Sequence, residues 1–218
     1  MNYLAHILLS GPDPDWQLGG FLGDFVKGPL PPTSLSSVST ANSGLVDSQG
    51  RPWESGVVAG IQLHRQLDAY VDLAPEYVAC LELLGRPYRR VGGIALDVFF
   101  DHLLVRNWSQ FSSIALPDFS RGFYDLCARQ QQRLPVSAAN FMSRAAEHDL
   151  FQGYGRQSLY LPVLERIDER IRFETNLLAA GEAVLQRSTE LEQRFLQWMP
   201  QLLTKAAELR AGGLTESR

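Results

Sequence analysis

The helical character of the chain is clearest in residues 56–84, which read GVVAGIQLHRQLDAYVDLAPEYVACLELL. The apolar residues Val57 and Ile61 begin a stripe that continues through positions 64, 68 and Val71 at spacings of three and four. An amphipathic helix turns such a stripe toward the core of the protein. The segment therefore predicts one long helix over 56–84, and Gly85 directly after it is a typical helix stop.

The same period runs through most of the chain, and no stretch shows the alternation of a strand. We therefore expect an all-α fold, a single-domain helical bundle over residues 1–211 followed by a frayed tail at 212–218. Residues 29–56 are rich in Ser, Thr, Gly and Pro, which predicts a long mobile loop. Besides 56–84, the pattern places helices at about 2–10, 16–27, 93–112, 118–133, 137–150, 158–173, 176–187 and 189–210.

The composition excludes several classes of protein. With 45% apolar and 20% charged residues, the chain is typical of a soluble globular protein. A net charge of −4 implies no broad nucleic-acid surface. No run is apolar and long enough to span a membrane, and the N-terminus lacks a basic signal region, so we expect a cytoplasmic location and no membrane partner. Cys80 and Cys127 lie in apolar helical patterns, which favours two buried free thiols.

Polar residues occupy inward positions on two of the predicted helices. His64 and Asp68 lie one turn apart on the apolar stripe of 56–84. Asp97 and Asp101 lie one turn apart on the stripe of 93–112, and His102 follows directly. Such groups are costly to bury without a partner, and two carboxylates on one face repel each other unless a cation or a proton lies between them.

The N-terminal part adds His6 and Asp24, both within apolar helical patterns. Sets of His and Asp suit Mg²⁺, Mn²⁺, Fe²⁺ or Zn²⁺, and the absence of cysteine from them argues against a structural thiolate zinc site. The alternative is that His64 and Asp68 form an ordinary hydrogen bond on their helix, or that His64 is a capped core histidine, and that Asp97 and Asp101 face solvent. The recurrence of such sets on several helices favours a metal site.

Basic residues lie near these positions in the sequence. Arg65 follows His64 directly, so it is a candidate to contact a phosphate oxygen beside a metal. For any single one of the others, an ordinary solvated surface is the simpler interpretation. The others considered as candidates for substrate binding are Lys27, Arg86, Arg89 and Arg90.

Several blocks of the chain resemble the acyl carrier protein phosphodiesterase family, in the order in which that family has them. The resemblance extends from the start to about residue 205 and is strong only within the blocks. The blocks are MNYLAH at 1–6, GFLGDFVKG at 20–28, GIQLHRQLD at 60–68, LDVFFDH at 96–102, NWSQ at 107–110 and LEQRFLQWMP at 191–200.

This resemblance implies a helical fold distantly related to the HD phosphohydrolases. It further implies hydrolysis of the phosphodiester between 4′-phosphopantetheine and a serine of acyl carrier protein, with Mn²⁺ or Mg²⁺ as cofactor. The order Asp101-His102 reverses the HD dipeptide, and the 29–56 segment looks long for the family. The expected metal-site residues are His6, Asp24, His64, Asp68, Asp97, Asp101 and His102, with Asp24, Asp68 and Arg65 in catalytic roles.

Two other functions remain open at this stage. A different HD-like enzyme acting on a nucleotide or another small phosphodiester would need the same metal site but no docking surface for a protein. A non-enzymatic helical binding module would use the His and Asp residues as buried hydrogen-bond networks. Neither the metal nor the oligomeric state follows from the sequence. If the substrate is acyl carrier protein, as the resemblance implies, the turn with Arg86, Arg89 and Arg90 is the expected docking patch for this acidic protein.

Overall fold

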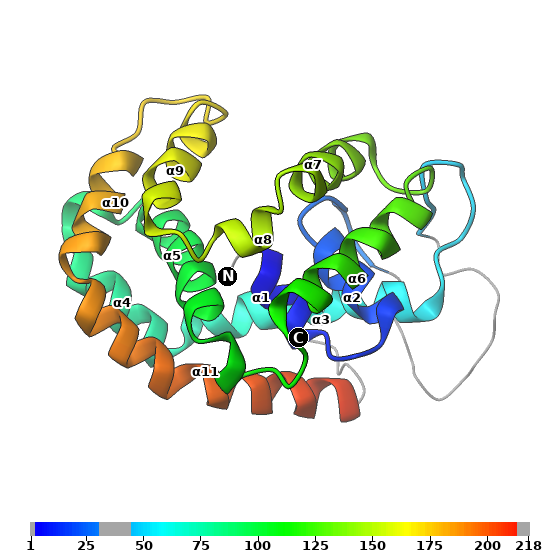
Figure 1. Ribbon diagram of the computed structural model, residues 1–218, viewed down its shortest axis with the longest axis horizontal. Coiled ribbons are helices and arrows are strands. Elements are labelled where there is room, and N and C mark those ends of the chain that lie inside the picture. Colours follow the sequence, from blue (N-terminus) through cyan, green and yellow to red (C-terminus); the bar gives the residue numbers. More distant parts are fainter. Residues whose placement is uncertain (1–2, 31–44, 213–218) are drawn as a thin grey trace.

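The computed structural model describes residues 3–30 and 45–212 and is all-α, as predicted (Figure 1). Within these residues the β pairing is limited to an isolated bridge between Val46 and Pro52. Short 3₁₀ turns at Arg86–Tyr88, Trp108–Gln110 and Gln157–Leu159 link some of the helices. The helices are α1 Tyr3–Leu9, α2 Pro14–Leu22, α3 Ser55–Leu73, α4 Pro75–Leu84, α5 Gly92–Arg106, α6 Leu116–Arg129, α7 Val136–Glu147, α8 Leu150–Gly153, α9 Tyr160–Asp168, α10 Leu177–Gln186 and α11 Ser188–Ala211.

The prediction of one helix over 56–84 was wrong, because this segment forms α3 and α4. Proline has no N–H to donate, and it disfavours a helical conformation in the residue before it. Ala74 accordingly adopts φ −66° and ψ 125°, and Pro75 starts α4. Gly85, with φ 86°, ends α4 as expected. The apolar stripe of α3 is unaffected, since the break comes after Leu73.

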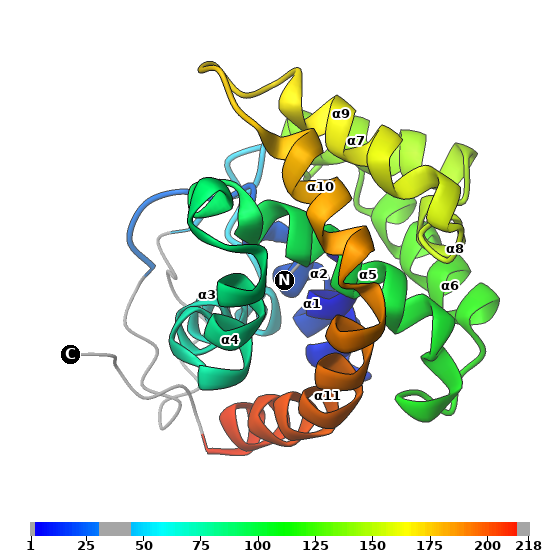
Figure 2. The same cartoon turned by 90° about the vertical axis from the view of Figure 1, so that its left-hand side faces the viewer.

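Helix α1 lies at the centre of the molecule. It packs against α2, α5 and α11, and most of its apolar residues are buried (Figure 1). Helix α10 packs on α5 and α9, and the long α11 runs beneath α3 and α4 (Figure 2). Residues at the start of the chain therefore meet residues from α2 and α3 in the interior. Both cysteines, Cys80 and Cys127, are buried free thiols.

Helices α2 and α3 cross with their backbones in close contact. A Cβ added to Gly60 would lie 2.3 Å from Trp16 O and 2.9 Å from Gly19 Cα, which are backbone atoms. A Cβ added to Gly19 would lie 2.1 Å from Val57 O. The two backbones can approach this closely because glycine occupies both positions.

Replacing Gly60 by alanine should therefore destabilise the protein by about 2 kcal/mol, the usual cost of overpacking a rigid contact. Urea unfolding would measure the change in the free energy of unfolding. The matched control is Gly122→Ala on α6, where an added Cβ meets no atom within 4 Å. Equal stability of Gly60→Ala and the wild type would contradict the close crossing.

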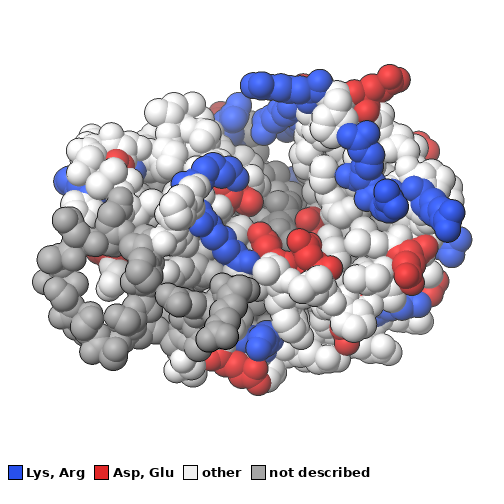
Figure 3. Space-filling model, turned by 180° about the vertical axis from the view of Figure 1, so that it is seen from behind, with Lys and Arg blue, Asp and Glu red and all other residues white. Residues whose placement is uncertain are grey.

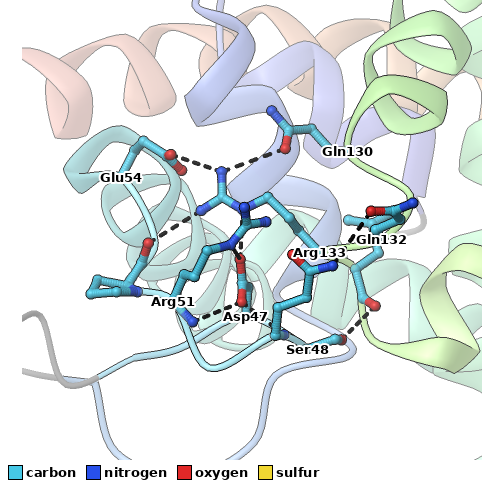
Figure 4. Close-up of polar contacts among 10 residues, drawn as sticks. Asp47, Ser48, Arg51, Glu54, Gln130, Gln132 and Arg133 are labelled. Carbon is cyan, nitrogen blue, oxygen red and sulfur yellow. Dashed lines mark hydrogen bonds and ion pairs between the residues drawn. The ribbon is translucent and has the colours of Figure 1, made fainter.

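The segment before α3 is tied to a distant part of the chain. The Asp47 carboxylate is buried and accepts hydrogen bonds from the N–H groups of Gln49 and Arg51, and Arg133 Nε donates to it at 2.6 Å (Figure 4). Arg133 Nη1 also donates to Glu54 at 2.7 Å. Residues 45–54, which fall within the predicted 29–56 loop, are thus anchored, and the last two residues of that prediction belong to α3. Residues 31–44, and all of the predicted tail at 212–218 except Gly212, lie outside the described residues.

Candidate metal centre

Two histidines and one carboxylate meet where α1 and α3 pack beside the end of α2. His6 Nε2 lies 3.1 Å from Asp68 Oδ1, and His64 Nε2 lies 3.1 Å from Asp68 Oδ2. The two imidazole rings stack, with centroids 3.8 Å apart. Both rings are buried, while 43% of the Asp68 side chain is exposed. The group therefore opens to solvent along its carboxylate side.

The tautomer of His64 follows from its second nitrogen. His64 Nδ1 lies 2.7 Å from the carbonyl oxygen of Gly20, and a carbonyl oxygen can only accept a hydrogen bond. Nδ1 is therefore the donor, and in the neutral ring Nε2 presents a lone pair toward Asp68. A lone pair and a carboxylate oxygen 3.1 Å apart repel each other unless a proton or a cation lies between them.

His6 has a related feature. Among the described residues, neither of its buried ring nitrogens has a hydrogen bond of acceptable geometry, although Nε2 lies close to Asp68. Burial, and then the neighbouring His64, lower the pKa of His6 to about 3, so the ring is neutral near pH 7. A neutral imidazole with an unused nitrogen is the form that binds a metal ion.

The pKa values of Asp68 and of the neighbouring Asp24 are shifted in opposite directions. Burial alone would raise the pKa of Asp68, but the His6 and His64 rings hold it well below its usual range. Asp24, just beyond the end of α2, has an oxygen 3.7 Å from His64 Nε2, and burial raises its pKa. Asp68 is thus the anionic member, and Asp24 is the more readily protonated one.

Three of the predicted metal ligands have other partners in the structure. The two carboxylate oxygens of Asp101 accept the N–H groups of Leu4 and Ala5, each at 3.2 Å, at the start of α1. His102 Nδ1 donates to Tyr154 O at 2.7 Å, about 100° around α5 from Asp101. Tyr77 donates to Asp97 at 2.9 Å. The structure therefore does not bring Asp97, Asp101 and His102 into the His6–His64–Asp68 group.

Replacing Asp101 by asparagine should lower the free energy of unfolding by about 2 kcal/mol and leave metal affinity nearly unchanged. The amide has one acceptor oxygen, so one buried N–H at the start of α1 would lose its partner. Thermal unfolding and Mn²⁺ titration of the same preparation measure the two effects. Loss of Mn²⁺ binding without loss of stability would instead make Asp101 a ligand.

Arg65 holds the segment that carries Asp24. Its Nη1 donates to Gly28 O at 2.7 Å and its Nη2 to Val26 O at 2.9 Å. The sequence predicted that the Arg65 guanidinium contacts a substrate phosphate. Its other N–H groups could make this contact, which stays a prediction. Lys27, in the held segment, is exposed.

Comparison with known proteins assigns the family. The sequence model of the acyl carrier protein phosphodiesterase family matches residues 1–202. The chain belongs to this family. An acyl carrier protein phosphodiesterase of Serratia proteamaculans is 29% identical over 95% of this chain and 98% of its own length. Those of Yersinia pestis and Shigella boydii are 30% and 32% identical, over 94% and 95% of this chain and 97% and 98% of theirs.

No solved structure matches the chain, so the predicted likeness to HD phosphohydrolases stays a prediction. Family membership makes the chain a phosphodiesterase. Within the described residues no helix is both long and apolar enough to cross a membrane.

The turn between α4 and α5 carries the predicted docking residues of this family member. Arg86, Arg89 and Arg90 are all exposed. The guanidinium carbon of Arg90 lies 4.9 Å from the centroid of the Phe173 ring, and Asn176 donates to Pro87 O at 2.9 Å. The turn is thus fixed against the segment before α10, and its arginines are presented to solvent on an ordered support.

The two glycines that contact the His64 ring were missed by the sequence analysis. Gly20 supplies the carbonyl group for His64, and Gly23 lies against the same ring. Glycines inside a helical pattern are a recognisable signal of close backbone approach. Two of them, Gly20 and Gly23, fall within the block at 20–28, where they were noted only for their resemblance to the family.

Proposed function

We propose that this chain hydrolyses the phosphodiester between 4′-phosphopantetheine and a serine of acyl carrier protein, and that a divalent cation bound by His6, His64 and Asp68 is required. Family membership supports the reaction. One observation carries the site: His6 Nε2 and His64 Nε2 each lie 3.1 Å from an oxygen of the Asp68 carboxylate. A cation between these atoms would be bound by all three side chains.

The residues of the group fit such a cation. Two ligand atoms that bind one ion at right angles, each at about 2.1 Å, lie about 3 Å apart. Both nitrogen–oxygen distances in the group are 3.1 Å. Two imidazoles and a carboxylate suit Mn²⁺ or Fe²⁺ as well as Zn²⁺, whereas Mg²⁺ would rely more on the oxygen atoms. We propose Mn²⁺ or Mg²⁺ as the working ion.

Each residue of the site has a role that follows from its position. A bound cation would polarise the phosphoryl oxygens and make a nearby water more acidic. Asp68 faces both imidazoles and would neutralise part of the charge of a bound cation. Asp24 has a raised pKa and a half-exposed carboxylate, so it is placed to take a proton from the attacking water. Arg65 keeps the Asp24 segment against α3.

We propose that the carrier protein docks on the turn with Arg86, Arg89 and Arg90. Figure 3 shows acidic side chains near the centre of one face, with basic side chains on both sides of them. A protein substrate that carries negative charge can contact basic residues while its phosphodiester reaches the site. Two buried free thiols also suit the reducing conditions of the cytoplasm, where we place the reaction.

Replacing Arg86, Arg89 and Arg90 together by glutamate should raise KM for the carrier protein by about tenfold or more and weaken its salt dependence. Activity on a small phosphodiester such as bis(p-nitrophenyl) phosphate should not change. The matched control replaces Arg121, Arg129 and Arg144, which are exposed on α6 and α7. An unchanged KM in the triple glutamate variant, or an equal rise of KM in the control, would contradict the proposed docking patch.

The test of the function itself is the mass of holo-acyl carrier protein after incubation with this protein and Mn²⁺. The expected result is the loss of one phosphopantetheine arm, and EDTA should prevent it. If the carrier protein keeps its arm while bis(p-nitrophenyl) phosphate is cleaved, the chain acts on small phosphodiesters instead. If neither is cleaved by folded, Mn²⁺-saturated protein, the proposed activity is wrong.

A further inference from the structure

The last turn of α2 lies directly against the His64 ring. A Cβ added to Gly23 would lie 2.2 Å from His64 Cγ and 2.4 Å from Cδ2. Non-bonded carbon atoms do not approach this closely, so a side chain at position 23 would displace the ring. One turn earlier on α2, Gly20 O accepts the hydrogen bond from His64 Nδ1.

The glycine at position 23 is explained by space and not by backbone conformation. Gly23 has φ −51° and ψ −37°, which every L-residue adopts readily. Alanine would favour this helical conformation by about 1 kcal/mol relative to glycine. Glycine therefore brings no conformational advantage here, and the His64 ring is what fills the space that a side chain would take.

The ring has little freedom to move elsewhere. It stacks on the His6 ring at a centroid distance of 3.8 Å, which is already van der Waals contact. Its Nδ1 hydrogen bond of 2.7 Å fixes the rotation about the side-chain axis. A displaced ring must therefore break the contact with Gly20 O, move Nε2 away from Asp68, or do both.

We propose that Gly20 and Gly23 are positioning residues, which set the tautomer of His64 and the direction of its Nε2 lone pair. The inference rests on the proposed metal site but not on the identity of the substrate. Gly20 acts through its carbonyl group, which keeps the proton on Nδ1. Gly23 acts by leaving room for the ring. Partners of this kind, behind a metal-binding histidine, commonly change metal affinity by about 10- to 100-fold.

The experiment compares the wild type with Gly23→Ala and Gly122→Ala in metal-free form. Long-range ¹H–¹⁵N NMR of the imidazole nitrogens reads the tautomer of each histidine, and His64→Gln assigns the His64 signals. In the wild type and in Gly122→Ala, the His64 proton is expected on Nδ1. In Gly23→Ala, that signal should shift toward the mixture of tautomers found in a free ring.

Mn²⁺ titration, followed by the loss of the free-ion EPR signal, gives a second readout. Gly23→Ala should bind Mn²⁺ at least about tenfold more weakly than the wild type. Gly122→Ala has the same chemical change at a position where nothing lies within 4 Å, so it should bind Mn²⁺ like the wild type. Thermal unfolding of each variant separates weaker binding from a lost fold.

Two outcomes would overturn the proposal. One is a wild-type His64 with its proton on Nε2, and this result decides the matter even if Gly23→Ala does not fold. The other is a folded Gly23→Ala protein with the wild-type tautomer and wild-type Mn²⁺ affinity. Because the tautomer is read without substrate, failure to cleave acyl carrier protein would contradict the proposed function and leave this test intact.

Discussion

Asp68→Ala should abolish measurable Mn²⁺ binding and lower kcat/KM for holo-acyl carrier protein by about 10³-fold or more. Asp68 is the carboxylate that both His6 and His64 face, each at 3.1 Å. Its loss leaves two adjacent imidazoles, without the negative charge that attracts a cation. The expected loss of rate is of the order found when a main electrostatic group of an active site is removed.

The matched control for this variant is Asp72→Ala. Asp72 lies one turn further along α3 and is exposed, so it tests the loss of one negative charge on the same helix. Its activity and Mn²⁺ affinity should stay within about twofold of the wild type. Folded Asp68→Ala protein that binds Mn²⁺ as well as Asp72→Ala would place the cation elsewhere.

Asp47→Asn should lower the free energy of unfolding at pH 7 by about 3 kcal/mol, because Arg133 would keep a largely buried charge with a weakened partner. The Arg133 side chain is only 14% exposed. Burial would raise the pKa of Asp47, but hydrogen bonds from Arg133, Arg51 and Gln49 hold it well below the usual range. Urea unfolding at several pH values measures the effect.

The difference in the free energy of unfolding between the wild type and Asp47→Asn should depend on pH in one direction, falling as the solution becomes acidic. A carboxyl group with a lowered pKa in the folded state stabilises the protein above its unfolded pKa of about 4, and this stabilisation is lost as the pH falls. The difference between the wild type and Asp47→Asn should therefore shrink between about pH 4 and pH 2. Arg51→Ala is the control, since 55% of that side chain is exposed and a cost below about 1 kcal/mol is expected. Equal costs for the two variants would contradict the buried pair.

Periodicity predicted the all-α fold and the inward face of α3, because the side chains of successive turns line up along a helix. His64 is buried as that stripe requires, and it meets Asp68. The break at Pro75 was also visible in the sequence. It was missed because the apolar period continues across it into α4.

The same reasoning failed for α5 for a different reason. Asp101 is fully buried, as its stripe predicted, but backbone N–H groups of α1 satisfy it instead of a cation. The sequence of one helix does not specify which partner meets a buried carboxylate. His102 follows Asp101 directly, and neighbouring residues on a helix point about 100° apart. His102 therefore contacts Tyr154 on another side of α5.

The other features that the sequence pattern did not predict are contacts between distant segments of the chain. The anchoring of residues 45–54 depends on Arg133, which is 86 positions from Asp47. The meeting of His6 with α3 depends on α2, whose glycines let it approach both α1 and α3. A pattern within one segment carries no information on such partners, whereas the resemblance of the blocks to a known family predicted that His6 and His64 share a site.

The most direct test of the proposed metal centre is a crystal of the protein soaked with Mn²⁺ and measured for anomalous scattering. The strongest anomalous peak is predicted between His6 Nε2, His64 Nε2 and an oxygen of Asp68, about 2.2 Å from each. A strongest peak beside Asp97, Asp101 or His102, or no peak at saturating Mn²⁺, would contradict the account.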